Sequence, residues 1–296
     1  MPKTTLSFYL HIIAVAVIVF ALGHFFYAHP EERAAAGVSK DGAQKESVYD
    51  RVMRTKTIRC GYFIRPGFLM KDVNSGELSG IAHDYAEELA KSLSLKIEWA
   101  AEIGGGDIAT ALDGGRIDAF CSAVWPTSAR ARAMDFVAPI ATTPLLILLR
   151  ADDNRFARYD DLNDPKLKAS YVDGTTMALV TMQRFDKVQA VSLPQLSALS
   201  EPLVELAGGK ADFALADAYV GMDYITKNPG KLKIFNIDHP VGQYTNAIFV
   251  KQDEYKFKRL LDVATQELIL TGVVDRIIKK YDQYPGSILP IMSPVS

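Results

Sequence analysis

The chain has 296 residues, 49% of them apolar, and a formal net charge of −2 at pH 7. This length permits one or two domains with a substantial core. A small negative charge gives no basic footprint for nucleic acid, so we expect no nucleic-acid partner. The two cysteines, Cys60 and Cys121, have neither metal-ligand spacing nor the spacing of a redox pair. The sequence therefore predicts no metal site and no cofactor.

One long apolar segment lies near the start of the chain. Residues 6–28 form an almost unbroken apolar run, and a bilayer span takes roughly 20 residues. Lys3 precedes the run, which favours a cytoplasmic N-terminus and export of everything downstream. We expect residues 1–29 to be an uncleaved anchor in the inner membrane, with the rest in the periplasm. A cleaved signal peptide, which would leave the protein soluble, is the alternative.

A polar stretch separates this segment from a regular pattern. Residues 30–55 are expected to be a tether and an entry segment, because most of them are small, polar or charged. Strand and helix patterns alternate from there, which predicts an α/β fold with parallel-rich sheets. The expected strands are 58–63, 95–99, 117–123, 169–172, 188–193, 211–216 and 247–250, and the expected helices are 81–93, 108–112, 175–185, 202–207 and 257–281.

One short unit occurs twice. The sequence GGRIDAF at residues 114–120 and the sequence GGKADFA at 208–214 share two glycines, a cation and an aspartate before an apolar strand. A single echo is weak as a repeat. It is consistent with two similar lobes.

Arg130 is the first candidate binding residue. It follows a strand and the Pro126-Thr127 pair, so it falls in the first turn of a predicted helix. Backbone N–H groups at a helix start and a planar guanidinium can together hold an anion. The alternative is a structural ion pair with a surface Asp or Glu.

The stretch around Arg130 resembles the signature of the family-3 extracellular solute-binding proteins, the periplasmic amino-acid receptors of ABC importers. Their members read L-x-x-G-K-x-D, an apolar strand, and then T-P-E-R-A-x-x-x-D-F-S-x-P-Y. The resemblance covers roughly residues 56 to 285. The matching residues here are Leu112, Gly115, Arg116, Asp118, Thr127, Arg130, Ala131, Asp135, Phe136 and Pro139.

The resemblance implies a two-lobed fold of the type II periplasmic-binding-protein kind, following the N-terminal apolar helix. Residues 56–148 and 247–285 would form lobe 1, residues 149–246 lobe 2, and residues 286–296 a tail. Chain crossings are expected near residues 148–151 and 244–247. The implied function is the substrate-binding component of an ABC-type uptake system for an amino acid or an amino-acid-like carboxylate. An ABC permease would be its partner.

The resemblance also assigns a site. Arg130 would grip the carboxylate of a bound amino acid, beside Ser122 and the backbone of Ala123. Thr175 and Thr176 would close on the same carboxylate from lobe 2, although this pair reads equally well as an ordinary helix N-cap.

Asp217 stands where the family places the carboxylate that holds the ligand's ammonium group. A buried pair of this kind is favourable only when both partners are hydrogen-bonded. The alternative is that Asp217 caps the helix that follows it.

Three departures from the family pattern bear on specificity. Residues 104–107 read Gly-Gly-Gly-Asp where many members have an aromatic wall, so we expect a wider pocket or a looser wall. Phe63 stands where receptors for basic amino acids carry an acid, and residues 65–68 replace the usual Y-x-P-F. Trp125 could supply the missing aromatic wall or belong to the core.

The cysteines fall in two predicted strands. Buried inert thiols are the favoured interpretation, and a disulfide is the alternative if the strands are neighbours.

We expect a binding protein without catalytic residues. One alternative is an enzyme of the same fold resembling the cyclohexadienyl dehydratases, which act on prephenate or arogenate. Another is a sensory or accessory solute-binding module. No second pocket carboxylate or histidine is placed for acid catalysis, which argues against the enzyme.

Overall fold

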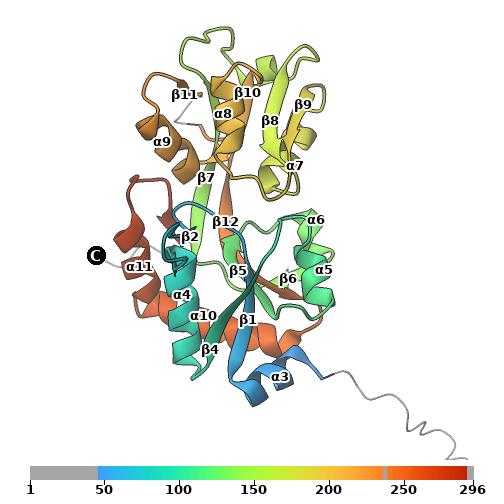
Figure 1. Cartoon of the computed structure of the whole chain (residues 1–296), viewed down its shortest axis with the longest axis vertical. Helices are drawn as coiled ribbons and strands as arrows, with labels where there is room; N and C mark the ends of the chain where they lie inside the picture. Colours follow the sequence, from blue (N-terminus) through green and yellow to red (C-terminus); the bar gives the residue numbers. More distant parts are fainter. Residues whose placement is uncertain (1–45, 236–238, 292–296) are drawn as a thin grey trace, which may run out of the picture. The chain divides into compact units, whose positions relative to one another are not determined.

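The computed structural model describes residues 46–235 and 239–291 (Figure 1). The predicted anchor at residues 6–28 lies outside the described residues. Among those described, no helix combines the length and the apolar character that a membrane span needs. One compact unit of the chain runs from Ser47 onward.

The elements of the first half alternate as the sequence predicts. Strands β1, β4 and β5 pair in parallel in the order β4-β1-β5 (Figure 1). We call this part lobe 1. Its elements are α3 (Val48–Thr55), β1 (Thr57–Tyr62), β2 (Met70–Lys71), β3 (Leu78–Ser79), α4 (Ile81–Ser92), β4 (Lys96–Glu102), α5 (Ile108–Asp113), β5 (Ala119–Val124), α6 (Ser128–Ala131) and β6 (Met134–Phe136).

A second sheet region follows, with the order β7-β10-β8-β9, and we call it lobe 2. Here β8 pairs in parallel with both β9 and β10. Its elements are β7 (Ala141–Arg150), a 3-10 turn (Tyr159–Leu162), β8 (Lys168–Val172), α7 (Thr176–Arg184), β9 (Gln189–Leu193), α8 (Glu201–Ala207), β10 (Phe213–Asp217), α9 (Ala218–Lys227) and β11 (Leu232–Phe235).

The chain then returns to lobe 1. Strand β12 (Gly242–Lys251) leads to α10 (Tyr255–Leu270) and α11 (Val273–Tyr281), and a short strand β13 (Leu289–Pro290) follows. Helices α4, α10 and α11 contribute to one buried cluster of lobe 1, and the Tyr85 hydroxyl of α4 lies 2.6 Å from the Thr265 hydroxyl of α10. Ile288 of the tail belongs to the same cluster.

Two long antiparallel strands connect the lobes. Residues 141–145 of β7 pair with residues 242–246 of β12, and residues 145–149 of β7 pair with β10. The first crossing therefore lies at Leu145, upstream of the expected position near 148–151, because Leu148 already pairs with Ala214 inside lobe 2. At the second crossing, Asn246 pairs with β7 and Ala247 with β5.

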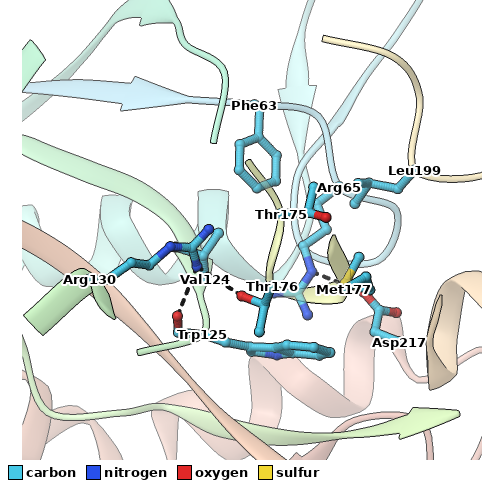
Figure 2. Close-up of a pocket in the computed structure, with 10 residues that line it drawn as sticks. All are labelled: Phe63, Arg65, Val124, Trp125, Arg130, Thr175, Thr176, Met177, Leu199 and Asp217. Carbon is cyan, nitrogen blue, oxygen red and sulfur yellow. Dashed lines mark hydrogen bonds and ion pairs between the residues drawn. The ribbon is translucent and has the colours of Figure 1, made fainter. Parts of the chain in front are cut away.

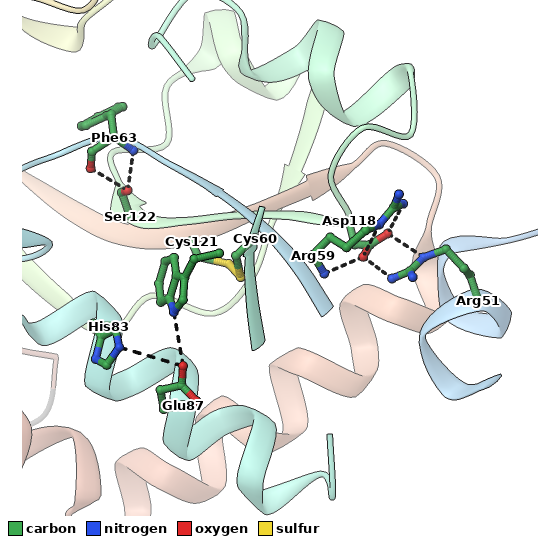
Figure 3. The surroundings of a disulfide bond; sticks show 10 residues. Arg51, Arg59, Cys60, Phe63, His83, Glu87, Asp118, Cys121 and Ser122 are labelled. Atoms are coloured by element: carbon green, nitrogen blue, oxygen red, sulfur yellow. Dashed lines mark hydrogen bonds and ion pairs between the residues drawn. A yellow bond between two sulfur atoms is a disulfide. The ribbon is translucent and has the colours of Figure 1, made fainter. Parts of the chain in front are cut away.

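The two cysteines form a disulfide, so the favoured expectation of free thiols is wrong (Figure 3). Cys60 of β1 and Cys121 of β5 are both buried, with their Cα atoms 5.6 Å apart. Parallel neighbouring strands bring both side chains to the same face of the sheet. A disulfide was the alternative if the two strands were neighbours, and β1 does pair with β5.

Asp118, one of the signature residues, is fully buried next to the disulfide (Figure 3). Its carboxylate accepts from the backbone N–H of Arg59 at 2.7 Å and from the guanidinium groups of Arg59 and Arg51. A buried carboxylate is tolerated when its oxygens are paired in this way. This part of the signature therefore holds α3, β1 and β5 together.

Candidate functional site

A small cavity lies where the ends of lobe 1 strands meet the start of α7 in lobe 2 (Figure 2). Ligands of open α/β sheets bind outside the carboxyl ends of the strands, and this cavity is in that position. Its volume is about 30 Å³. The lining residues are Phe63, Arg65, Val124, Trp125, Arg130, Thr175, Thr176, Met177, Leu199 and Asp217.

Arg130 lies in α6 and extends its guanidinium across to lobe 2 (Figure 2). Nη1 donates to the Trp125 carbonyl at 2.9 Å and to the Thr176 hydroxyl at 3.0 Å, and Nη2 donates to the Gly174 carbonyl at 3.2 Å. All three acceptors are neutral. Within residues 46–235 and 239–291, no carboxylate forms an ion pair with Arg130. The described residues therefore contain no structural ion pair of Arg130, which was the alternative interpretation.

Burial, together with the charge of Arg65, lowers the pKa of Arg130 to about 10. The guanidinium thus remains charged at neutral pH. Helix α6 has only four residues, and the backbone N–H of Arg130 is already bonded to the Thr127 hydroxyl at 3.2 Å. We therefore expect the backbone N–H groups at the start of α6 to contribute little to anion binding, and the charged guanidinium of Arg130 to contribute most.

The two threonines of lobe 2 have different surroundings. The hydroxyl of Thr175 accepts from the backbone N–H of Ala178 at 3.2 Å and donates to the Val172 carbonyl at 2.7 Å. Thr175 is therefore the N-cap of α7, as the alternative interpretation held. Thr176, the first residue of α7, faces Arg130 across the cavity (Figure 2).

Ser122 and Ala123 do not line the cavity, although the sequence placed them in the site. The hydroxyl of Ser122 donates to the Phe63 carbonyl at 2.9 Å and accepts from the Phe63 N–H at 3.0 Å (Figure 3). A hydroxyl has one proton to donate, and this one is already engaged. Ala123 has a left-handed backbone with φ of 51°, and its carbonyl accepts from Arg65 at 2.7 Å.

Arg65 is the residue that the sequence interpretation missed. Its Nε donates to Asp217 Oδ2 at 3.1 Å, and both side chains are buried, with exposed fractions of 4% and 1%. Nη1 donates to the Ala123 carbonyl and to Asn246 Oδ1, each at 2.7 Å. Burial lowers the pKa of Arg65, and the neighbouring Asp217 carboxylate opposes this effect. The only signal in the sequence was that residues 65–68 depart from the family pattern.

Asp217 also caps α9, because its Oδ1 accepts from the Val220 N–H at 3.0 Å. The N-cap alternative is thus confirmed for Asp217. Both of its carboxylate oxygens already have partners, one in the backbone and one in Arg65.

Two aromatic side chains form walls of the cavity. Trp125 stacks on Tyr244 with ring centroids 4.7 Å apart, and its Nε1 donates to the Thr143 hydroxyl at 2.7 Å. Phe63 packs against Phe120 with centroids 5.4 Å apart. Trp125 is 3% exposed, so it belongs to the core, and its side chain also lines the cavity.

The glycine loop at residues 104–106 packs closely against lobe 2, and the expectation that it widens the pocket or loosens one wall stays a prediction. A Cβ at Gly105 would lie 2.8 Å from the Gly174 carbonyl, and one at Gly106 would lie 2.8 Å from Gln195 Oε1. The Gly106 N–H donates to the same Gln195 oxygen at 2.9 Å. The absence of side chains lets this loop of lobe 1 approach lobe 2 closely.

A second cavity of about 250 Å³ adjoins the first and shares Phe63, Thr175 and Leu199 with it. Its other lining residues are Ile64, Pro66, Glu102, Gly105, Gln195, Leu196, Ser197, Ala198 and Ser200. The site is therefore a small charged chamber that continues into a larger one.

Among curated proteins, the chain is 23% identical over 206 residues to a probable histidine-binding protein of Campylobacter jejuni, covering 70% of this chain and 77% of that protein. It is 21% identical over 224 residues to the glutamate-binding protein GluB of Corynebacterium efficiens, covering 72% and 74%. These identities are low, but the alignments extend over most of both chains.

Solved structures with the same fold include an ancestral arginine-binding protein bound to arginine, with a TM-score of 0.67 and 25% identity over 77% of this chain and 98% of that one. The ancestral amino acid-binding protein AncCDT-1, a precursor of cyclohexadienyl dehydratase, has a TM-score of 0.69 and 24% identity over 80% and 99%. The family model of bacterial extracellular solute-binding proteins, family 3, matches residues 58–283. The chain therefore belongs to the family-3 bacterial extracellular solute-binding proteins.

Proposed function

We propose that this protein is the solute-binding component of an ABC uptake system for an amino acid or an amino-acid-like carboxylate. The observation that carries the proposal is the guanidinium of Arg130, which faces the cavity with only neutral acceptors around it. Arg130 is half-buried, and a cation removed from much of its water is costly until an anion pairs with it. The names of the relatives, which include histidine-, glutamate- and arginine-binding proteins, support an amino-acid-like ligand.

A carboxylate is the anion that best suits this position. A guanidinium can bind a carboxylate through two parallel hydrogen bonds, which are stronger than bonds to neutral acceptors. Arg130 comes from lobe 1 and Thr176 from lobe 2, so a ligand held between them would contact both lobes. We expect residues 56–148 with 247–285 to close against residues 149–246 as the ligand binds. The ligand shifts this equilibrium by binding the closed state more tightly.

We further propose that the mature protein is held at the outer face of the inner membrane by residues 6–28. The apolar length of this segment supports an anchor, and the family is one of extracellular proteins. An ABC permease would then receive the solute from the closed lobes.

The hydrogen-bond partners of Asp217 favour a binding role over the dehydratase alternative. Asp217 is the one carboxylate among the described lining residues of the smaller cavity, and it is paired with Arg65 and capped by a backbone N–H. A general acid needs a proton to give to the substrate. Both oxygens of Asp217 are placed as hydrogen-bond acceptors for Arg65 and for a backbone N–H, which is not the placement of a proton donor to a substrate.

The test is thermal unfolding of the full chain in mild detergent with each common amino acid, with prephenate and without ligand. A ligand at 100 times its Kd adds about 2.7 kcal/mol to stability, which raises Tm by several degrees. We expect micromolar or tighter binding, which corresponds to about −8 kcal/mol or more favourable. Conversion of prephenate to phenylpyruvate, followed by ultraviolet absorbance, would instead identify an enzyme. A folded protein that responds to none of these compounds would contradict the proposal and favour a sensory or accessory role.

A further inference from the structure

The position predicted to hold a ligand's ammonium group is already occupied by a side chain of the protein. Asp217 is 1% exposed, and the Nε of Arg65 lies 3.1 Å from its Oδ2. We propose that this pocket selects a monocarboxylate with an apolar or aromatic body and no ammonium group at Cα, such as a 2-oxo acid. The inference rests on the proposed function, because it takes Arg130 as the group that binds the carboxylate.

The first argument concerns the hydrogen-bond partners that the Asp217 carboxylate already has. One oxygen of Asp217 accepts from the Val220 N–H and the other from Arg65, and almost no surface of the residue is open. An incoming ammonium group would have to compete with this guanidinium for Asp217 Oδ2 in a place with almost no open surface. Removing one partner of a buried pair leaves the other charge uncompensated, which is strongly unfavourable.

The second argument is that Arg65 is fixed in its position by the connecting strands. Its Nη1 donates to Asn246 Oδ1 on β12, and its guanidinium lies 4.0 Å above the ring of Phe68. Asn246 is itself fully buried, and its Nδ2 donates to the Thr143 hydroxyl of β7 at 3.0 Å. Arg65 is thus bonded to both lobes and to the strands between them. Moving it aside for a ligand would break this whole network.

The third argument is the charge of the chamber. The ionisable residues that line the smaller cavity in the described part are Arg65, Arg130 and Asp217, with two positive charges and one negative charge, while Glu102 lines only the larger cavity. A monocarboxylate brings the sum to zero. A zwitterionic amino acid adds no net charge and leaves one cation without a counter-charge in a buried site. Unbalanced charge is most costly where water is excluded.

The walls indicate the rest of the ligand. Apart from the charged groups and the threonines, the smaller cavity is lined by Phe63, Val124, Trp125, Met177 and Leu199. Apolar and aromatic walls with a few convergent polar groups are typical of small-molecule sites. The larger cavity, which shares Phe63 and Leu199, gives room for an apolar or aromatic body beyond the carboxylate.

Matched pairs of ligands test the inference on the unmodified full chain. Isothermal titration with phenylpyruvate against phenylalanine, and with 2-oxo-4-methylpentanoate against leucine, compares each oxo acid with the amino acid of the same body. We expect an oxo acid to bind at least tenfold more tightly than its amino acid. Equal or tighter binding of an amino acid, from these pairs or from the other common amino acids, overturns this inference and leaves the proposed function standing. Binding of no carboxylate at all by the folded protein overturns both.

Two variants locate the source of the selectivity. Arg65→Met frees Asp217, so we expect it to shift the preference at least tenfold toward the amino acid of each pair. Arg132→Met, which changes an exposed arginine on the same lobe, is the matched control and should leave the preference unchanged. An Arg65→Met protein that is folded by circular dichroism and keeps the oxo-acid preference contradicts the inference. If that variant does not fold, the ligand pairs on the unmodified chain still decide.

Discussion

The guanidinium of Arg130 and the hydroxyl of Thr176 lie 3.0 Å apart and join α6 of lobe 1 to the first residue of α7 in lobe 2. The same guanidinium also donates to the carbonyl of Gly174, two residues before α7 begins. The side chain of Arg130 thus contacts both lobes and lines the cavity between them. A ligand that binds Arg130 therefore acts on the contact between the lobes.

Replacing Arg130 with alanine should weaken ligand binding by at least about 2 kcal/mol, because truncating one partner of a buried ion pair has at least this effect. This corresponds to roughly a 30-fold increase in Kd, measured by isothermal titration. Arg132→Ala removes an exposed arginine two residues away and is the control. An unchanged Kd in Arg130→Ala would reject the carboxylate-binding role.

Variants of Thr175 and Thr176 should differ in whether they change protein stability or ligand affinity. Thr175→Ala removes the N-cap of α7, so we expect a loss of about 1 kcal/mol of unfolding free energy with little change in Kd. Thr176→Val removes the hydroxyl that contacts Arg130, so we expect Kd to rise by roughly fivefold with a smaller effect on stability. Urea unfolding and titration on both variants check this. The opposite assignment of effects would show that Thr175, and not Thr176, contacts the ligand.

The disulfide should stabilise lobe 1 without taking part in binding. Cys60 and Cys121 are 61 residues apart in the chain, and neither lines the cavity. Closing a loop of this length limits the unfolded chain, for which about 2–4 kcal/mol is typical. We expect the double variant Cys60→Ser with Cys121→Ser to lose this amount in urea unfolding at 25 °C. Its Kd should remain within about threefold of the parent value, and a larger change would tie the bridge to the site.

Trp125 should report ligand binding by fluorescence, because its ring stacks on Tyr244 and lines the cavity. The chain has two tryptophans, and the other one, Trp99, stacks on His83 away from the cavity. We expect Trp99→Phe to retain the ligand-dependent change in emission and Trp125→Phe to lose it. Retention of the full change in Trp125→Phe would place the ligand elsewhere.

We expect part of the unfolding free energy of lobe 2 to be lost at low pH because of Asp153. Hydrogen bonds from Arg155 lower the pKa of its carboxyl group, with Nη2 of Arg155 at 2.7 Å from Oδ2. An unfolded aspartate has a pKa near 3.9, so the stabilisation is complete above about pH 5 and is lost as the pH falls through the lower folded value. Asp153→Asn should therefore be destabilised in urea at pH 7, and the difference should shrink near pH 3. A constant difference would contradict this origin, and the exposed Asp152→Asn variant serves as control.

Local patterns were sufficient for most elements of the fold. The period of four that begins at Ile81 becomes α4, and the apolar run before Arg130 becomes β5, each within a few residues of the expected bounds. These patterns are readable because burial of one helix face or of a whole strand leaves its mark on consecutive residues. Arg130 and Thr176 could likewise be named from their positions relative to a strand end and a helix start.

Long-range partners were not readable in the same way. Arg65 and Asp217 are 152 residues apart, and their contact depends on how the lobe 1 loop after β1 meets the end of β10. The loop at residues 104–106 looked like an opening because glycine has no side chain, yet Gln195 and Gly174 fill the space beside it. Ser122 was named from its place in the strand, while its single proton turned out to bond the Phe63 carbonyl.

The sequence by itself determined the order of strands and helices, the family signature and the charged residues available for a site. Only the tertiary structure decided which of those charges cancel one another: Arg65 pairs with Asp217, whereas the described acceptors around Arg130 are all neutral. It also decided that Cys60 and Cys121 form a disulfide. The physical reason is range. Periodicity and capping act between neighbours in the chain, whereas pairing and burial of charge depend on strand register and on contacts between distant segments.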